Sequence, residues 1–428
     1  MKSPTASEMS GTIAPLPQKN SSCVYIPLLM ITLLIVQLYF SSDPPFRLSQ
    51  QAVDPSNVDG LHPASLSPEA YRKFPESGEL TTGTCNISKG EWVIDLKGPL
   101  YTNASCAFIQ EHQNCLKNGR PDLGYMNWRW KPVECDLPPF DGRLFLNMMT
   151  HKTMAFAGDS IARNHMQSLI CALSQIESPQ NLYRDAEDKF LTWNFPSYNF
   201  TLAILWSPYL VKKTEDAYKN VPEGVTKLFL DVVDDAWVSS LPQYDYVVLS
   251  SGQWYFKPGV YIIGGEIVGC HYCPGMNISQ VGFFFAYEAA LHSVYKNIIS
   301  TPQYKGTTIL RTISPDHFEN GTWSTGGTCL RTVPFMNHSM DGINALMRDS
   351  QLKVLNNVSA NEPAHAPKLK LLDITYSALM RPDGHPGPYR YPFPFSNGKS
   401  GHVQNDCLHW CLPGPIDTWN EMLLWILK

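Results

Sequence analysis

The chain has 428 residues, of which 43% are hydrophobic and 17% are charged. This length fits one large domain or two ordinary ones, and the apolar fraction is ample for a sizeable core. The net charge of −5 and the lack of a long basic run argue against nucleic acid as the main partner.

The N-terminal part of the chain predicts a membrane anchor followed by a spacer. Residues 23–40 are 18 uncharged and mostly apolar positions, close to the lower limit for a membrane span. Because no small-residue cleavage site follows, we expect a retained signal anchor rather than a cleaved signal peptide. Residues 1–22, which contain Lys2 and Lys19, would form a cytosolic head. Residues 41–80 contain six prolines and predict a flexible luminal stem.

Cysteines and glycosylation sequons favour a luminal location for the rest of the chain. Ten cysteines lie beyond the anchor, an even number that fits five disulfides in an oxidising compartment. They are Cys85, Cys106, Cys115, Cys135, Cys171, Cys270, Cys273, Cys329, Cys407 and Cys411. Seven sequons for N-glycosylation follow the anchor as well, at Asn86, Asn103, Asn199, Asn277, Asn320, Asn337 and Asn357.

Two regions follow the stem. Residues 84–150 are rich in Cys and Trp without a long helical pattern, which predicts a loop-rich, disulfide-tied N-terminal cap. In residues 151–428 apolar runs alternate with helical patterns, which predicts an α/β fold with a mainly parallel sheet and flanking helices. The expected strands are Thr153–Ala157, Phe200–Trp206, Tyr246–Ser250, Thr308–Thr312 and Leu369–Ile374, and the expected helices are Ala162–Leu173, Val281–Ile299 and Met340–Asn356.

A serine and a distant Asp-His pair predict nucleophilic catalysis. Ser160 follows the first expected strand and precedes a helix, so its hydroxyl would project from a strand-to-helix turn, beside the free N–H groups of the helix. Asp406 precedes His409 by three residues and could hold that imidazole in one tautomer. Together they are nucleophile, orienter and base, in one of the chain orders known for such triads. An ordinary helix start, with Asp159 or Ser160 as the N-cap, is the competing interpretation.

Other histidines compete with His409 for the role of base. They are His151, His165, His271, His317, His385 and His402. We favour His409 because Asp406 lies at short range, and because Cys407 and Cys411 can fix its loop in place.

Two further patterns carry weaker predictions. Cys270 and Cys273 could be half of a zinc site, but no second pair with matching spacing exists, so we expect structural disulfides and no metal. Most tryptophans are expected in the core, while some could line a groove and stack on sugar rings. The candidates for such a groove are Trp128, Trp130, Trp254 and Trp410.

Residues 84–428 resemble the plant trichome-birefringence-like wall polysaccharide O-acetyltransferases, which are similar to SGNH/GDSL esterases. The matching motifs are Gly158-Asp159-Ser160 with Arg163-Asn164 and Ser168-Leu169, Arg311-Thr312-Ile313-Ser314-Pro315 with His317-Phe318, Gly326-Gly327-Thr328-Cys329, Arg381-Pro382-Asp383-Gly384-His385-Pro386, and Asp406-Cys407-Leu408-His409-Trp410-Cys411-Leu412-Pro413-Gly414 with Asp417-Thr418-Trp419-Asn420. Thr84-Cys85, Trp128-Arg129-Trp130 and Cys135 match in the cap. His165 stands where many relatives carry Gln, which indicates a subgroup.

The resemblance implies an SGNH/GDSL-like fold and a single-pass type II enzyme of the Golgi membrane with a luminal catalytic region. It implies Ser160, Asp406 and His409 as the triad. The residues expected around the oxyanion and substrate are Gly158, Asp159, Arg163, Asn164, Gly252 and Gln253. The implied disulfides are Cys85–Cys135, Cys106–Cys171, Cys115–Cys411 and Cys329–Cys407, with Cys270 and Cys273 left to pair with each other.

The expected reaction transfers an acetyl group through acetyl-Ser160 onto a wall polysaccharide. The resemblance favours xyloglucan and its side-chain galactose, with mannan or xylan as alternative acceptors. A polysaccharide acetyl esterase and a non-catalytic polysaccharide-binding protein are the other function classes. We expect no bound cofactor. An acetyl donor is required, and acetyl-coenzyme A is one possibility, although we find no glycine-rich loop that would cradle its phosphates.

Overall fold

The computed structural model describes residues 85–396 and 403–428. The expected head, anchor at 23–40 and stem at 41–80 lie outside the described residues. Among the helices of the described ranges, none is long and apolar enough to cross a membrane. The anchor therefore stays a prediction.

A seven-stranded sheet forms the centre of the fold, with the strand order β13-β12-β9-β3-β6-β5-β4. The strands are β3 (Thr153–Gly158), β4 (Gln180–Arg184), β5 (Phe190–Phe195), β6 (Phe200–Trp206), β9 (Tyr246–Ser250), β12 (Thr307–Arg311) and β13 (Leu369–Leu372). Neighbours from β13 to β6 pair in parallel, while β5 and β4 add an antiparallel hairpin at one edge. The predicted α/β fold with a mainly parallel sheet is confirmed.

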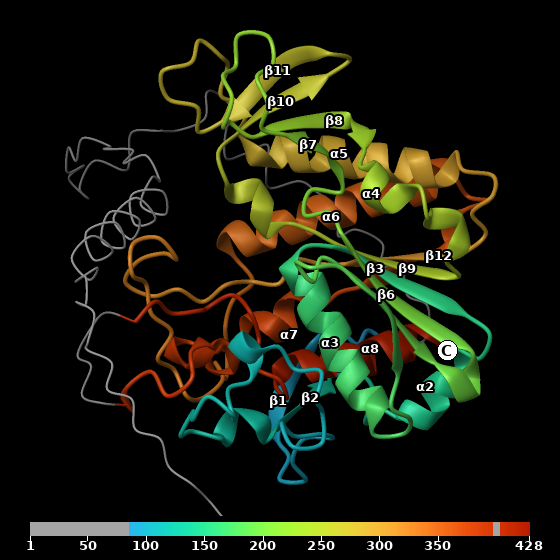
Figure 1. Cartoon of the computed structure of the whole chain (residues 1–428), viewed down its shortest axis with the longest axis vertical. Helices are drawn as coiled ribbons and strands as arrows, with labels where there is room; N and C mark the ends of the chain where they lie inside the picture. The colour runs from blue at the N-terminus through green and yellow to red at the C-terminus, as the bar shows by residue number, and fades with distance from the viewer. Residues whose placement is uncertain (1–84, 397–402) are drawn as a thin grey trace, which may run out of the picture. The chain divides into compact units, whose positions relative to one another are not determined.

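Helices cover both faces of this sheet, because successive side chains of a strand point to opposite sides. Met154 and Phe156 of β3 pack into one core with α3 and α8, whereas Ala155 and Ala157 pack into another with α5 and α6. Figure 1 shows α5 and α6 on one side of the sheet and α3 and α8 on the other. The helices are α2 (Gly142–Met148), α3 (Ser160–Ser174), α4 (Asp235–Val238), α5 (Gly282–Ile299), α6 (Gly342–Asn361), α7 (Thr375–Leu379) and α8 (Thr418–Leu427).

A second, four-stranded sheet was not predicted from the sequence. Its order is β11-β10-β8-β7, with β7 (Val211–Thr214), β8 (Lys227–Val233), β10 (Gly259–Ile263) and β11 (Glu266–His271). Helix α5 packs against β8 and β11, so the same helix contacts this sheet and covers the central one. The expected strand Leu369–Ile374 is shorter than predicted, because Ile374 already caps α7.

The cap shares its core with residues 151–428. Strands β1 (Gly90–Ile94) and β2 (Trp128–Pro132) pair antiparallel, and Trp92 and Trp130 enter the core that holds α3 and α8. Trp92 Nε1 donates to the carbonyl oxygen of Ser377 at 2.8 Å, and Trp130 Nε1 to that of Ile87 at 2.8 Å. Trp130 is fully buried, so the expectation that it lines a groove is wrong: its indole ring packs inside this shared core.

Five disulfides connect the described cysteines. They are Cys85–Cys135, Cys106–Cys171, Cys115–Cys411, Cys270–Cys273 and Cys329–Cys407, the same pairs that the resemblance implied. Two of them fix the segment on either side of His409, through Cys407 and Cys411. The sulfurs of Cys270 and Cys273 bond to each other and offer no thiolate to a metal.

The seven sequon asparagines all reach the surface. Asn86 is half-buried, and the others are exposed. Glycan attachment at these positions is therefore sterically open, and their occupancy stays a prediction.

Candidate active site

Ser160 is the first residue of α3, directly after the turn that follows β3. Gly158 forms this turn with φ of +156°, and a Cβ there would lie 1.8 Å from the main-chain oxygen of Ser250 on the neighbouring strand. Only glycine therefore allows β3 and β9 to approach this closely. The Asp159 carboxylate accepts from the N–H groups of Ile161 at 3.0 Å and Ala162 at 3.3 Å, and it does not take the N–H of Ser160.

The catalytic interpretation of Gly158-Asp159-Ser160 and its interpretation as an ordinary helix start are therefore compatible. Asp159 is an ordinary N-cap of α3, and its buried carboxylate satisfies two helix N–H groups. Ser160 follows the cap, so its hydroxyl is not used for capping. Its N–H is oriented as a helix N-terminal donor, which is the type of group that stabilises a developing oxyanion.

Asp406 and His409 form a hydrogen-bonded pair. His409 Nδ1 lies 2.8 Å from Asp406 Oδ2, while Asp406 Oδ1 accepts from the main-chain N–H of His409 at 3.0 Å and of Leu408 at 3.2 Å. Burial alone raises the pKa of Asp406, but the attraction of His409 and these hydrogen bonds outweigh it and hold the pKa well below its usual range. Asp406 is therefore ionised and fixes the Nδ1–H tautomer of His409.

The other ring nitrogen of His409 differs from Nδ1 in its surroundings. Nε2 is buried and has no hydrogen-bond partner within residues 85–396 and 403–428. A buried imidazole nitrogen without a partner is unusual in a folded protein. It is what a general base requires before its proton donor is in place.

Helix α3 is tied to the His409 loop by Asn164. Asn164 lies one turn after Ser160, on the same side of the helix. Its Oδ1 accepts from the main-chain N–H of Trp410 at 2.8 Å, and its Nδ2 donates to the carbonyl oxygen of Trp410 at 3.3 Å. No hydrogen bond joins Ser160 directly to His409 in the described part of the chain. The buried Asn164–Trp410 pair is the bond that brings their segments together.

Trp410 holds the loop from the inside. Its ring is fully buried, stacks on His385 with ring centroids 4.2 Å apart, and donates from Nε1 to Ser314 Oγ at 3.0 Å. His385 Nδ1 in turn lies 2.7 Å from the carbonyl oxygen of His409. The expectation that Trp410 lines a sugar groove is therefore wrong, because its indole is enclosed in the core beneath the base. Trp128 and Trp254 are half-buried, and Lys257 Nζ lies over the Trp254 ring at 3.4 Å.

The expected oxyanion residues differ in what their polar groups do. Gly252 follows β9, and Ser250 of β9 is in register with Gly158 of β3. Gly252 and Ser160 therefore both follow the carboxyl ends of neighbouring parallel strands. Gln253 uses its amide N–H to bond the carbonyl oxygen of Ser314 at 2.8 Å. Arg163 Nη1 donates to the carbonyl oxygen of Asp188 at 2.8 Å, and its guanidinium lies over the Trp206 ring at 5.3 Å. Both polar groups of the Asn164 side chain bond to the main chain of Trp410.

His112 was not identified from the sequence. It lies on a one-turn helix of the cap, Glu111–Gln113, with its ring edge-on to His409 and the ring centroids 5.6 Å apart. Burial and the proximity of His409 lower the pKa of His112 to about 4, so its ring is neutral near pH 7. No local motif surrounds His112, and only the tertiary packing of the cap reveals its place in the site.

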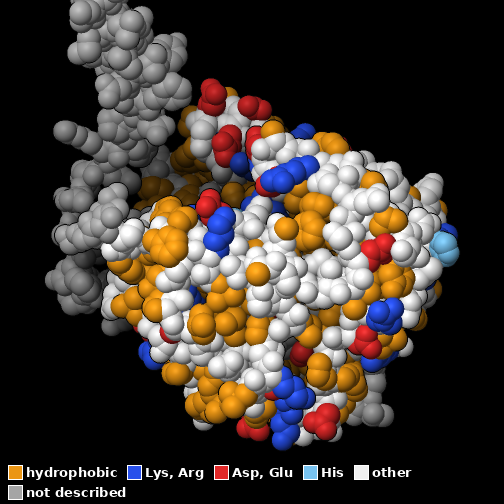
Figure 2. Space-filling model, turned by 60° about the horizontal axis from the view of Figure 1, so that its bottom comes forward, with side chains coloured by type: hydrophobic (Ala, Val, Ile, Leu, Met, Phe, Trp, Pro, Cys, Tyr) orange, Lys and Arg blue, Asp and Glu red, His pale blue; other side chains and the backbone are white. Residues whose placement is uncertain are grey.

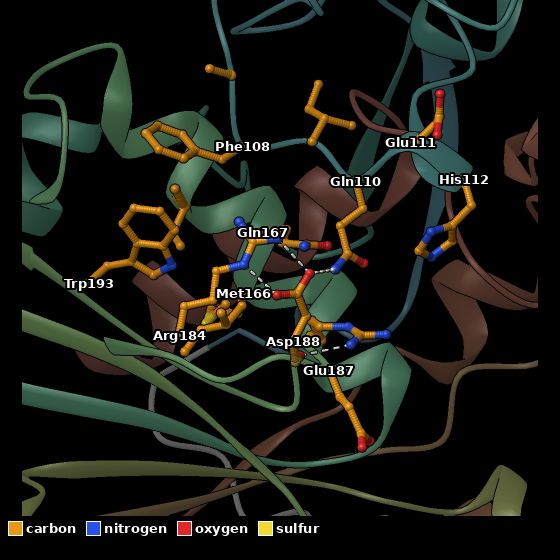
Figure 3. Close-up of a pocket in the computed structure, with 15 residues that line it drawn as sticks. Phe108, Gln110, Glu111, His112, Met166, Gln167, Arg184, Glu187, Asp188 and Trp193 are labelled. Atoms are coloured by element: carbon orange, nitrogen blue, oxygen red, sulfur yellow. Dashed lines mark hydrogen bonds and ion pairs between the residues drawn. The ribbon is translucent and has the colours of Figure 1, made fainter. Parts of the chain in front are cut away.

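A cavity of about 670 Å³ adjoins these residues (Figure 3). It lies between the cap segment 107–112, one face of α3 that includes Arg163 and Gln167, and the hairpin of β4 and β5. His112 connects the two regions, because it lines the cavity and its ring lies edge-on to that of His409. Arg163, which also lines the cavity, follows Ser160 on α3 by three residues.

The sequence matches one family over most of its length. Residues 137–426 match PC-Esterase, described as the GDSL/SGNH-like acyl-esterase family found in Pmr5 and Cas1p, and residues 83–136 match the PMR5 N-terminal domain. Protein trichome birefringence-like 25 of Arabidopsis thaliana is 43% identical over 405 residues, which cover 92% of this chain and 88% of the relative. Proteins named Xyloglucan O-acetyltransferase 1 are 41% identical in Populus trichocarpa, with 93% and 91% covered, and 38% identical in Arabidopsis thaliana, with 96% and 97% covered.

Proposed function

Because this chain belongs to the PC-Esterase family of GDSL/SGNH-like acyl-esterases, alongside trichome birefringence-like proteins and xyloglucan O-acetyltransferases, we propose that it acetylates xyloglucan through an acetyl-serine intermediate on Ser160. The general activity, a plant polysaccharide O-acetyltransferase, follows from the relatives. The acceptor and the catalytic residues are the proposal.

One observation carries the assignment of the triad. His409 presents a buried Nε2 without a hydrogen-bond partner in the described ranges, while Asp406 holds its Nδ1. The loop that bears it is bonded through Asn164 to the helix that begins with Ser160. This arrangement supports Ser160 as nucleophile, His409 as base and Asp406 as the group that orients the base.

In the first half of the reaction, Ser160 Oγ attacks the carbonyl carbon of the acetyl donor as His409 Nε2 takes the serine proton. The tetrahedral intermediate expels the leaving group of the donor, which receives that proton from His409. The N–H of Ser160 and that of Gly252 would stabilise the oxyanion, and one such donor contributes about 10²–10³ in rate.

In the second half, a sugar hydroxyl gives its proton to His409 and attacks the acetyl carbonyl. Ser160 Oγ leaves and recovers the proton, so the enzyme returns to its starting state and one acetyl ester has moved to the sugar. An esterase would use the same residues with water as the second nucleophile. Bound sugar that displaces water would favour transfer over hydrolysis.

We place the acetyl group on side-chain galactose of xyloglucan, with mannan and xylan as the alternative acceptors. The Populus and Arabidopsis relatives named Xyloglucan O-acetyltransferase 1 support xyloglucan. The apolar segment 23–40 supports a Golgi membrane protein of type II with its catalytic region in the lumen.

The test compares the full chain with Ser160→Ala. Each protein is incubated with an acetyl donor and with xyloglucan, mannan and xylan oligosaccharides, and the products are examined by mass spectrometry for the gain of one acetyl group. We expect a gain on xyloglucan that is lost in Ser160→Ala. Release of acetate without an acetylated sugar would indicate an esterase, and no Ser160-dependent chemistry would leave only a binding function.

A further inference from the structure

The cavity that His112 and Arg163 line is built from three separate elements. Arg163, Met166, Gln167 and Ile170 lie on one face of α3, since their spacing matches the helical repeat. The cap contributes residues 107–112, and the hairpin of β4 and β5 contributes Arg184, Asp188 and Trp193 among others. Figure 3 shows the labelled side chains around a common space, with Phe108 and Trp193 at one end and His112 at the other.

Three residues that line this cavity each carry a polar side-chain atom that is buried without a hydrogen-bond partner in the described part of the chain. These atoms are Gln110 Oε1, Gln167 Oε1 and Arg163 Nε. Gln167 is only 4% exposed, so bulk water does not solvate its amide freely. Buried polar atoms are almost always hydrogen-bonded in folded proteins. Two acceptors and one donor on residues that line one cavity therefore indicate a polar ligand that completes them.

One end of the cavity is aromatic. Phe108 and Trp193 contact edge to face, with ring centroids 5.0 Å apart, and both are half-buried. The apolar side chains of Met166, Ile170 and Leu191 line the cavity as well. Aromatic rings bind the apolar C–H face of a pyranose, while its hydroxyls require hydrogen-bond partners at its edge. The cavity offers both kinds of surface.

The charges of the cavity do not suit a phosphorylated acetyl donor. Its two guanidinium groups, of Arg163 and Arg184, are outnumbered by the carboxylates of Glu111, Glu187 and Asp188. Arg184 is bonded to Asp188 in bidentate fashion, at 2.5 Å and 2.8 Å, and is not free for an anion. Charges of both signs are also scattered in small groups over the face seen in Figure 2. A neutral ligand is therefore favoured over a diphosphate.

We propose that this cavity is an acceptor subsite that binds one neutral sugar residue of the polysaccharide, next to the residue that receives the acetyl group. This inference rests on the proposed acetyltransferase function. The ring packs on Trp193 and Phe108, and three sugar oxygens bond to the polar side chains of Gln110, Gln167 and Arg163. Binding in this subsite selects the acceptor. Acetylation of Ser160 by the donor does not depend on it.

Gln167→Met tests the subsite, because it removes the amide while it keeps the length and apolar stem of the side chain. Gln180→Met is the matched control, since Gln180 is exposed on β4 and does not line the cavity. With the full chain we expect KM for xyloglucan oligosaccharides to rise roughly tenfold in Gln167→Met and to stay unchanged in Gln180→Met. The burst of p-nitrophenol from p-nitrophenyl acetate, which reports acetylation of Ser160, should be equal in all three proteins.

Binding without turnover separates this inference from the proposed function. Saturation-transfer NMR with Ser160→Ala should show contacts to xyloglucan oligosaccharide, and these should weaken when Gln167→Met or Trp193→Ala is added. If the oligosaccharide binds in this way but the wild-type chain transfers no acetyl group, the result would support the subsite and contradict the proposed transferase activity.

Three results would overturn the subsite. An unchanged KM in Gln167→Met would show that the cavity does not hold the acceptor. A slower p-nitrophenol burst in the same variant would place the donor there instead. No binding of xyloglucan, mannan or xylan oligosaccharides to the Ser160→Ala protein would reject a sugar site altogether.

Discussion

Asn164 is a buried side chain on which the geometry of the proposed triad depends. Both polar atoms of its amide bond to the main chain of Trp410, the residue after His409. Ser160 begins the same helix one turn earlier. The distance between the proposed nucleophile and base therefore depends on this pair of hydrogen bonds, made by a residue that the family resemblance had suggested for the oxyanion or the substrate.

Asn164→Ala should lower kcat about 10- to 100-fold, because a displacement near 1 Å at a catalytic group has an effect of this size. KM for the acceptor should remain unchanged, and the free energy of unfolding should fall by about 1–3 kcal/mol, since the main-chain groups of Trp410 lose their partner. Steady-state kinetics and thermal denaturation measure both effects. Asn361→Ala, at the exposed end of α6, is the control. A raised KM with an unchanged kcat would instead identify Asn164 as a substrate contact.

Asp406→Asn should reduce kcat by about 10³–10⁴, the size of effect expected when the orienting carboxylate of such a triad is lost. An amide in this place would present N–H to Nδ1 of His409 and favour the tautomer with the proton on Nε2. The base would then carry a proton where it must accept one. Rates of p-nitrophenyl acetate hydrolysis by Asp406→Asn and by the exposed control Asp349→Asn measure the effect. Activity within tenfold of wild type would remove Asp406 from the triad.

At the level of secondary structure, the turn between β3 and α3 determines where Ser160, the proposed nucleophile, lies. Gly158→Ala should destabilise the fold severely, by about 4 kcal/mol or more, because the new Cβ would lie 1.8 Å from the Ser250 carbonyl oxygen in a region of φ that L-residues avoid. Gly124→Ala is the control, since nothing lies within 4 Å of a Cβ there. Soluble yield and thermal midpoint report the outcome. A Gly158→Ala chain with wild-type stability would mean that β3 and β9 separate easily at their carboxyl ends.

The elements that carry the site were predictable, and the surfaces around it were not. The apolar run of β3 and the amphipathic face of α3 are local patterns, so the position of Ser160 followed from the sequence. The Asp406–His409 spacing is equally local. Burial of Trp130 and Trp410, the place of His112, and the hairpin that brings Trp193 to the cavity depend on contacts between distant segments. Residue type alone could not distinguish a core indole from one in a groove.

In the molecule as a whole, half-buried titratable groups change the stability of the fold in opposite directions as the pH changes. Burial and the neighbouring Asp417 raise the pKa of Glu421, in the first turn of α8, from 4.5 to about 8. Burial lowers the pKa of His112 and of His317 to about 4. Below about pH 6.5 the unfolded chain gains protons at these histidines that the folded chain does not, so acid destabilises the fold.

Glu421 has the opposite effect, because it destabilises the fold as the pH rises. Its folded-state pKa is raised, so between about pH 4.5 and pH 8 the unfolded chain releases a proton that the folded chain retains, and stability falls as pH rises. Glu421→Gln removes this loss and leaves the histidines unchanged. The difference in thermal midpoint between Glu421→Gln and the wild type should therefore be small at pH 5 and grow to a few degrees in favour of the variant at pH 8, at about 2 °C for each 1 kcal/mol. Calorimetry of both full chains across this range measures it. A difference that stays constant with pH would mean that Glu421 is ionised in the folded protein at neutral pH, and that solvent at its half-buried position offsets the burial.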